Sequence, residues 1–143
     1  MSTTTAPVTA PEAKPRRWTS RLLWVPQILL GVIFVAIAMG KLTGSHGIVH
    51  EFALIGAGQW LRYFVGITEL AGAIGLFTPW LAGPAAAGLA AEMAGATIIN
   101  ATVLRNTTFG PNVWMTLVLC AVFVAIAYGR RQQIKGLAAA IRR

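Results

Sequence analysis

Two of the four acidic residues, Glu69 and Glu92, lie inside apolar stretches that are long enough to cross a bilayer. A carboxylate near the middle of a membrane costs about 2 to 3 kcal/mol even on a lenient insertion scale. Such residues usually face a protein interior or a watery cavity, where they move protons or bind ligands. The two stretches follow each other directly, so we expect both carboxyl groups to approach near mid-depth. A purely structural role for each acid stays open.

Three further polar residues accompany these acids along the apolar stretches. Lys41 ends the first stretch, and Arg62 lies seven residues before Glu69, on nearly the same helical face. Either cation could contact Glu69, or each could extend to the outer headgroups, which we favour for Arg62. Asn100 lies in the outer half of the third stretch, where an amide more often joins helices than binds a ligand. The predicted intramembrane site is therefore Lys41, Arg62, Glu69, Glu92 and Asn100.

Other kinds of site have weaker support in the sequence. His46 and His50 are four residues apart, a spacing that could direct two imidazoles toward a metal. Two imidazoles are not a full ligand set, so we predict no metal and keep this pair only as a weak candidate. Cys120 is the single cysteine, which excludes an intramolecular disulfide and a dithiol redox cycle.

Four apolar stretches must position the polar residues. They cover residues 22–40, 61–80, 81–104 and 113–129. Each is close to the roughly 20 residues that a helix needs to cross about 30 Å of hydrocarbon. The chain is 56% hydrophobic and 11% charged, whereas soluble domains carry about 25% charged residues. The predicted fold class is all-α, a bundle of four transmembrane helices.

A short amphipathic helix is predicted on the outside, between the first and second spans. Ile48, Phe52 and Ile55 recur at the spacing of one helical face, and both histidines point the opposite way. Ser45 can cap the start of this helix and Gly56 can end it. We expect its apolar face to meet lipid or the bundle while the histidines face water.

The net charge of +8 is distributed unevenly along the chain. Nine of the 12 basic residues precede the first span or follow the fourth, and the remaining three lie at the loops that follow the first and the third span. Because cytoplasmic segments carry the basic excess, we expect a multi-pass protein of the plasma (inner) membrane with both termini cytoplasmic. The excess also attracts anionic lipid, so the lipid bilayer is the expected partner and nucleic acid is not.

Domain boundaries follow from this topology. Residues 1–20 are predicted as a disordered cytoplasmic tail, 21–130 as the membrane domain and 131–143 as a basic cytoplasmic tail. The last segment carries an apolar stripe, which is typical of either a short helix on the inner leaflet or a solvated tail.

The third span carries a small residue at every fourth position. This ridge comprises Gly83, Ala87, Ala91 and Gly95. Small residues let a second helix approach closely, so we expect the ridge to pack inside the bundle. A seam between subunits of a homo-oligomer is the alternative.

Two short motifs carry a family resemblance. The first span ends in Gly40-Lys41-Leu42, and the second reads GITELAGAIGL over residues 66–76. With four spans and an outer amphipathic segment, residues 22–130 resemble the DoxX and DoxX-like membrane proteins. The resemblance implies that Lys41 and Glu69 occupy recurrent polar positions of that family. The family is named after a subunit of an archaeal thiosulfate:quinone oxidoreductase, which implies a link to membrane redox chemistry.

The function predicted from the sequence is that of an accessory subunit in a membrane redox system, contacting quinone near Glu69. No redox centre is visible in the sequence and no cofactor other than quinone is indicated, so electron transfer needs a membrane oxidoreductase partner. We therefore expect an accessory subunit rather than a catalyst acting on its own. Two alternatives stay open, a small proton-coupled carrier or exporter that uses Glu69 and Glu92, and an assembly factor without a ligand.

Overall fold

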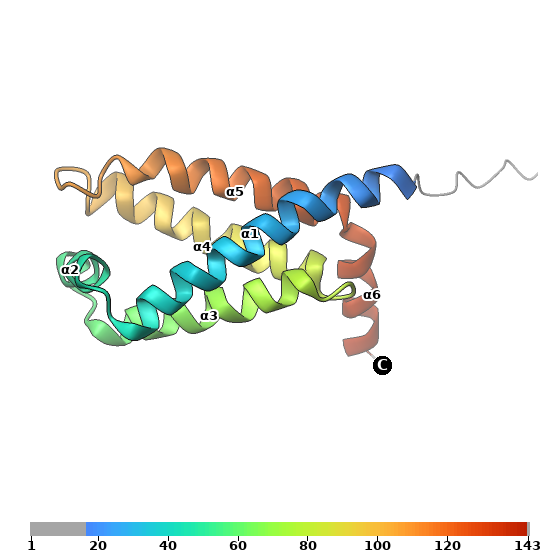
Figure 1. The fold of residues 1–143 in the computed structure, drawn as a ribbon, viewed down its shortest axis with the longest axis horizontal. Coiled ribbons are helices and arrows are strands. Elements are labelled where there is room, and N and C mark those ends of the chain that lie inside the picture. Colours follow the sequence, from blue (N-terminus) through green and yellow to red (C-terminus); the bar gives the residue numbers. More distant parts are fainter. Residues whose placement is uncertain (1–16, 143) are drawn as a thin grey trace, which may run out of the picture.

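The computed structural model describes residues 17–142, which form six α-helices (Figure 1). Four long helices run along one another, namely α1 (Arg17–Thr43), α3 (Gln59–Phe77), α4 (Ala82–Thr102) and α5 (Asn112–Gly129). Two short helices cross the opposite ends of this bundle, α2 (His46–Ile55) at one end and α6 (Arg131–Ile141) at the other. Each long helix contains a segment that is long and apolar enough to cross a membrane. The predicted all-α fold with four transmembrane helices is confirmed.

The bundle is built from two closely packed helix pairs. The first pair is α1 with α3, and the second is α4 with α5, while α3 and α4 touch along fewer residues. The core joins the pairs through Phe34 and Phe123, whose rings meet edge to face with their centroids 5.0 Å apart. The two pairs meet mainly through α3 and α4, and along still fewer residues through α1 and α5.

The outside of the bundle is apolar. Val25, Ile67 and Val118, which belong to three different long helices, are 70%, 59% and 61% exposed. Large apolar surfaces of this kind are rare on soluble monomers and match the hydrocarbon of a bilayer. The chain is an integral membrane protein whose long helices contact lipid.

Several helix ends follow from local backbone chemistry. Gly44 ends α1 with a positive φ of 76°, and Gly56 ends α2 with a φ of 77°. The second span was predicted to reach Trp80, but α3 ends at Phe77. Proline disfavours a helical conformation in the residue before it, and Thr78, which precedes Pro79, is extended with a ψ of 118°.

The first helix is longer than the sequence predicted. It begins at Arg17, inside the tail expected for residues 1–20, and the rest of that tail lies outside the described residues. As a consequence Pro26 lies in the interior of α1. The amide nitrogen of proline cannot donate, so one backbone hydrogen bond is missing at this point of the helix.

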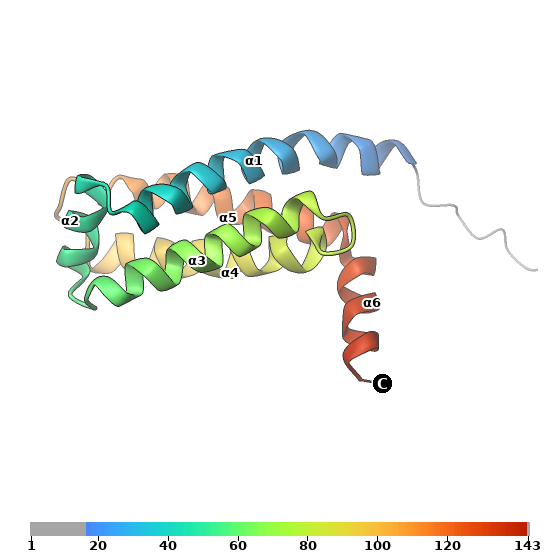
Figure 2. The ribbon, with the colours of Figure 1, turned by 60° about the horizontal axis from the view of Figure 1, so that its bottom comes forward.

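Within the segment after the fourth span, residues 131–141 form the helix α6. Gln133 fixes α6 to the turn between α3 and α4. Its Nε2 donates to the Pro79 carbonyl at 2.5 Å, and its Oε1 accepts from the Gly83 amide at 2.9 Å. As a result α6 runs across the end of the bundle instead of continuing α5 (Figure 2).

The small-residue ridge of α4 does not pack as predicted. Gly83 is buried beneath the start of α6, but Ala87, Ala91 and Gly95 are exposed. The helix instead buries a different face, which includes Ala86, Leu89 and Met93. Close approach occurs at Gly75 of α3, where an added Cβ would lie 2.7 Å from the Cβ of Ala85. Bundle packing as the role of the whole ridge was therefore wrong.

Candidate functional site

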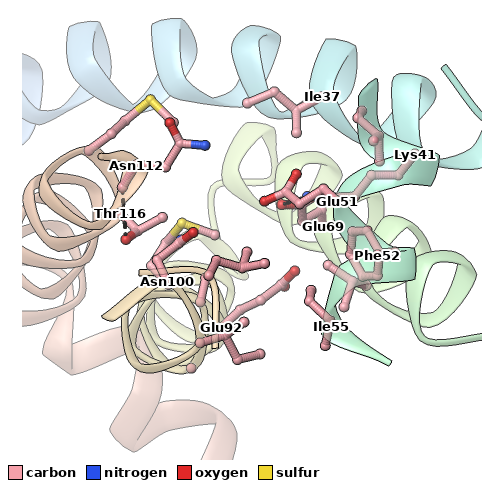
Figure 3. Close-up of a pocket in the computed structure, with 18 of the residues that line it drawn as sticks. Ile37, Lys41, Glu51, Phe52, Ile55, Glu69, Glu92, Asn100, Asn112 and Thr116 are labelled. Atoms are coloured by element: carbon pink, nitrogen blue, oxygen red, sulfur yellow. Dashed lines mark hydrogen bonds and ion pairs between the residues drawn. The ribbon is translucent and has the colours of Figure 1, made fainter. Parts of the chain in front are cut away.

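A cavity of about 320 Å³ lies among the long helices near the end that α2 covers (Figure 3). Most of its wall is apolar and is formed by residues such as Phe34, Phe52, Met93 and Leu119. Its polar lining comprises Lys41, Glu51, Glu69, Glu92, Asn100, Asn112 and Thr116. The cavity thus has the size and the character of a small-molecule site, with an apolar wall and a few polar groups that can orient a ligand.

An ion pair between Lys41 and Glu69 forms one side of the cavity. Lys41 Nζ lies 2.5 Å from Glu69 Oε1, and the two side chains are 13% and 1% exposed. Gly66 makes this contact possible, because a Cβ at that position would lie 3.1 Å from the Cβ of Lys41. The end of α1 can therefore approach α3 closely. Glu69 is buried as expected, and of the two alternatives left open for Lys41 the structure shows the contact with Glu69.

Glu92 reaches the same cavity from the opposite helix pair. Its Oε2 accepts a hydrogen bond from Thr68 Oγ1 at 3.3 Å, whereas its Oε1 is buried without a partner among the described residues. Glu69 and Glu92 do not bond to each other, but both carboxyl groups line the cavity (Figure 3). The structure therefore places the two intramembrane acids at one site.

Three buried acceptor atoms at this site have no hydrogen-bond partner in the described part of the chain. They are Glu69 Oε2, Glu92 Oε1 and Asn100 Oδ1. A buried polar atom left unpaired costs about 1 to 3 kcal/mol, so such atoms normally accept from water or from a ligand. A molecule that presents hydrogen-bond donors would satisfy them.

The structure adds a third carboxylate that sequence reasoning did not select. Glu51 of α2 lines the cavity together with Ile48 and Ile55. Burial raises the pKa of the Glu51 carboxyl above its usual range, and the charge of Lys41 lowers it by a smaller amount. Its position three residues after Ile48 and four before Ile55 places it on the buried face of the helix. That spacing was the signal that could have identified it.

Arg62 performs neither of the roles considered for it. It is 4% exposed, so the expectation that it extends to the headgroups was wrong, and no hydrogen bond or ion pair links it to Glu69. Its Nη1 donates to the Lys41 carbonyl, and its Nε donates to Gln59 Oε1 at 2.8 Å. The guanidinium also stacks over the Tyr63 ring at 4.2 Å. Arg62 therefore holds the end of α1 against α3 and positions Lys41.

The short helix α2 is amphipathic in the predicted sense. Ile48, Phe52 and Ile55 line the cavity, whereas His46 and His50 are exposed on the opposite face. In residues 17–142 no group of three or more His, Cys, Asp or Glu side chains is arranged to hold a metal ion. The pair of histidines is therefore separate from the cavity and its acids.

The fold and the cavity define a small multi-pass membrane protein with a ligand-sized site between its helices. The chain belongs to the DoxX-like family, because a sequence model of that family matches residues 25–126, well over half of its length. The matched segment includes Lys41, Glu69 and Glu92, and the family resemblance of the sequence is thereby confirmed. A search of curated proteins and a search of solved structures each found no match.

Proposed function

We propose that this protein is a quinone-binding accessory subunit of a membrane redox system. The observation that carries the proposal is the set of unpaired acceptors on Glu69, Glu92 and Asn100, which face an apolar cavity. Acceptors inside an apolar wall select a flat, lipid-soluble molecule with hydroxyl donors, which describes a quinol ring. The membership in the DoxX-like family adds support for a redox setting.

The residues of the cavity fit such a ring. Glu69 Oε2 and Glu92 Oε1 can each accept from a ring hydroxyl, and Lys41 can donate to a ring oxygen. The aromatic rings of Phe34 and Phe52 supply flat apolar surface. A bound quinol would supply two electrons and two protons to an oxidoreductase partner, and carboxylates beside its hydroxyls are suited to hold released protons. This chain's own part is to bind the ring, exclude bulk water and accept protons.

The proposal also places the protein in the plasma (inner) membrane, with the α6 end toward the cytoplasm. Support comes from the charges at that end, where Arg130, Arg131 and Lys135 follow the fourth span. The cavity and α2 then lie in the outer half of the bilayer. A reporter fused after Arg143 and another placed within residues 43–59 should report opposite sides, and reports from the same side would overturn this orientation.

Direct binding tests the proposal. The purified protein in lipid nanodiscs is titrated without oxygen with a tailless ubiquinol ring and separately with the oxidised ring. We expect saturable binding that favours the quinol, and Glu69→Gln and Glu92→Gln should each weaken it by about tenfold. His50→Gln, on the exposed face of α2, is the matched control and should bind as the wild type does. Absence of saturable quinol binding to the wild type would refute the proposal.

A proton-coupled carrier is the second candidate function. It is favoured by three carboxylates from three helices, Glu51, Glu69 and Glu92, which share one cavity with a single lysine. Groups of this kind can bind a cation or exchange protons across a membrane. Proteoliposomes with an internal pH indicator separate the candidates. A carrier moves protons with its solute and loses this flux in Glu92→Gln, whereas a quinone-binding subunit moves none by itself.

A further inference from the structure

A second hollow lies outside the cavity, in the seam between α3 and α4. Its wall is formed by Phe64, Thr68 and Gly72 of α3 together with Pro84, Gly88 and Glu92 of α4. The hollow opens onto the apolar exterior, where Phe64 is 58% exposed and Gly88 is exposed as well. This lipid-facing groove is thus separate from the end of the bundle that α2 covers.

Glycine accounts for the shape of the groove. An added Cβ at Gly88 would have no heavy atom within 4 Å, so the absence of a side chain there leaves open space. At Gly72 and Gly75 the opposite holds, since a Cβ would lie 2.7 Å from Leu89 and from Ala85 respectively. These two glycines let the helices approach along the floor of the groove, and Gly88 keeps its mouth open.

Glu92 connects the groove with the cavity, because it lines both. The contact between Thr68 Oγ1 and Glu92 Oε2 crosses the seam at 3.3 Å, and no other hydrogen bond joins α3 to α4 in the part of the chain that is described. A single long hydrogen bond is weak and easily exchanged. Glu92, held by this one hydrogen bond, therefore lies at the boundary between the lipid-facing groove and the interior cavity.

We propose that the groove holds the hydrocarbon tail of a lipid-soluble ligand whose head lies in the cavity, so that the ligand enters sideways from the bilayer past Thr68 and Glu92. The inference rests on the proposed quinol site and adds its route and its selectivity for a tail. The groove has one polar end, at Glu92, and is otherwise apolar, which suits a molecule with a hydroxyl-bearing head and an alkyl chain. A ring without a tail would use only the cavity.

Two adjacent residues of α4 provide a matched test. Gly88→Leu fills the open mouth of the groove, whereas Ala87→Leu places the same side chain on an exposed position that lines neither hollow. The dissociation constants of a decyl-tailed and a tailless ubiquinol are measured in nanodiscs. Each is expressed as moles of ligand in the bilayer per mole of lipid, which corrects for partitioning of the tail into the bilayer. Gly88→Ala adds a smaller side chain at the same position and serves as the test variant if Gly88→Leu does not fold.

In the wild type and in Ala87→Leu, the tail should strengthen binding by about tenfold or more. Gly88→Leu should remove this gain and leave the tailless affinity unchanged, and Gly88→Ala should reduce it. Equal affinities for the two ligands in the wild type, or an unchanged gain in Gly88→Leu, would overturn the groove proposal alone. If Gly88→Leu changes the oligomeric state but keeps the gain in affinity from the tail, the groove is a contact between copies of the chain and the proposal is also overturned. No binding of the tailless ring to the wild type would remove the quinol site as well.

Discussion

Replacing Lys41 with methionine should lower the free energy of unfolding by more than the loss of an ordinary hydrogen bond between two membrane helices. The substitution keeps an unbranched side chain that is one atom shorter, but it leaves Glu69, which is 1% exposed, without its partner at 2.5 Å. Removing one member of a buried ion pair costs about 3 to 5 kcal/mol. Hydrogen bonds between membrane helices average only about 0.6 kcal/mol. Because Lys41 is 13% exposed and lines a cavity, we expect the lower limit, about 3 kcal/mol.

The assay is reversible unfolding in mixed detergent micelles, followed by circular dichroism, for Lys41→Met, Glu69→Gln and the double variant. The double variant should lose less stability than the sum of the single losses, by at least about 1.5 kcal/mol, because neither charge is left alone in it. Lys135→Met, an exposed change on α6, should stay within about 0.5 kcal/mol of the wild type. Additive single losses, or a loss below about 0.5 kcal/mol for Lys41→Met, would refute the assigned ion pair.

Four further predictions concern α2, α1, the seam between α3 and α4, and α6. Burial raises the pKa of Glu51, so the docking of α2 should weaken as pH rises from the ordinary glutamate pKa of about 4.3 through the raised value of the folded protein. Amide hydrogen exchange in α2 should therefore become faster over this pH range, and Glu51→Gln should remove this pH dependence. Arg62→Met removes the donors that hold the Lys41 carbonyl, so exchange at the end of α1 should rise while α5 stays protected. Gly75→Ala should cost about 1 to 3 kcal/mol of unfolding free energy through overpacking. Gly136→Ala, with open space around it, should stabilise α6 by about 0.5 to 1 kcal/mol.

The fold was predictable because the bilayer restricts what a chain can do. Long apolar stretches must become helices in lipid, and a tight turn makes the second and third spans neighbours. The outer amphipathic helix was predictable from the period of Ile48, Phe52 and Ile55. The end of α3 was missed because hydropathy alone carries Trp80 into the span, whereas Pro79 ends the helix at the backbone level.

The candidate site was predictable only in part. Glu69 and Lys41 stand out because charge inside an apolar stretch needs a partner. The role of Arg62 could not be read from the sequence, since helical spacing does not reveal a bond to a backbone carbonyl of another helix. Glu51 was missed because a glutamate outside the spans looks like a solvated residue. The burial predicted for Ala87 and Ala91 was wrong because small residues occur both on lipid-facing and on buried faces of a membrane helix, so their spacing alone does not identify the buried face.

Photoaffinity labelling with an azidoquinone in native membranes tests the central claim, that the cavity binds a quinone, most directly. After irradiation and proteolysis, the account predicts that the label lies on peptides that carry cavity residues such as Phe52, Met93 and Met115. Excess unlabelled ubiquinol should compete for this labelling, and Glu69→Gln should reduce it. Label confined to lipid-exposed positions such as Trp80 and Val118, unaffected by competitor or by Glu69→Gln, would contradict the claim.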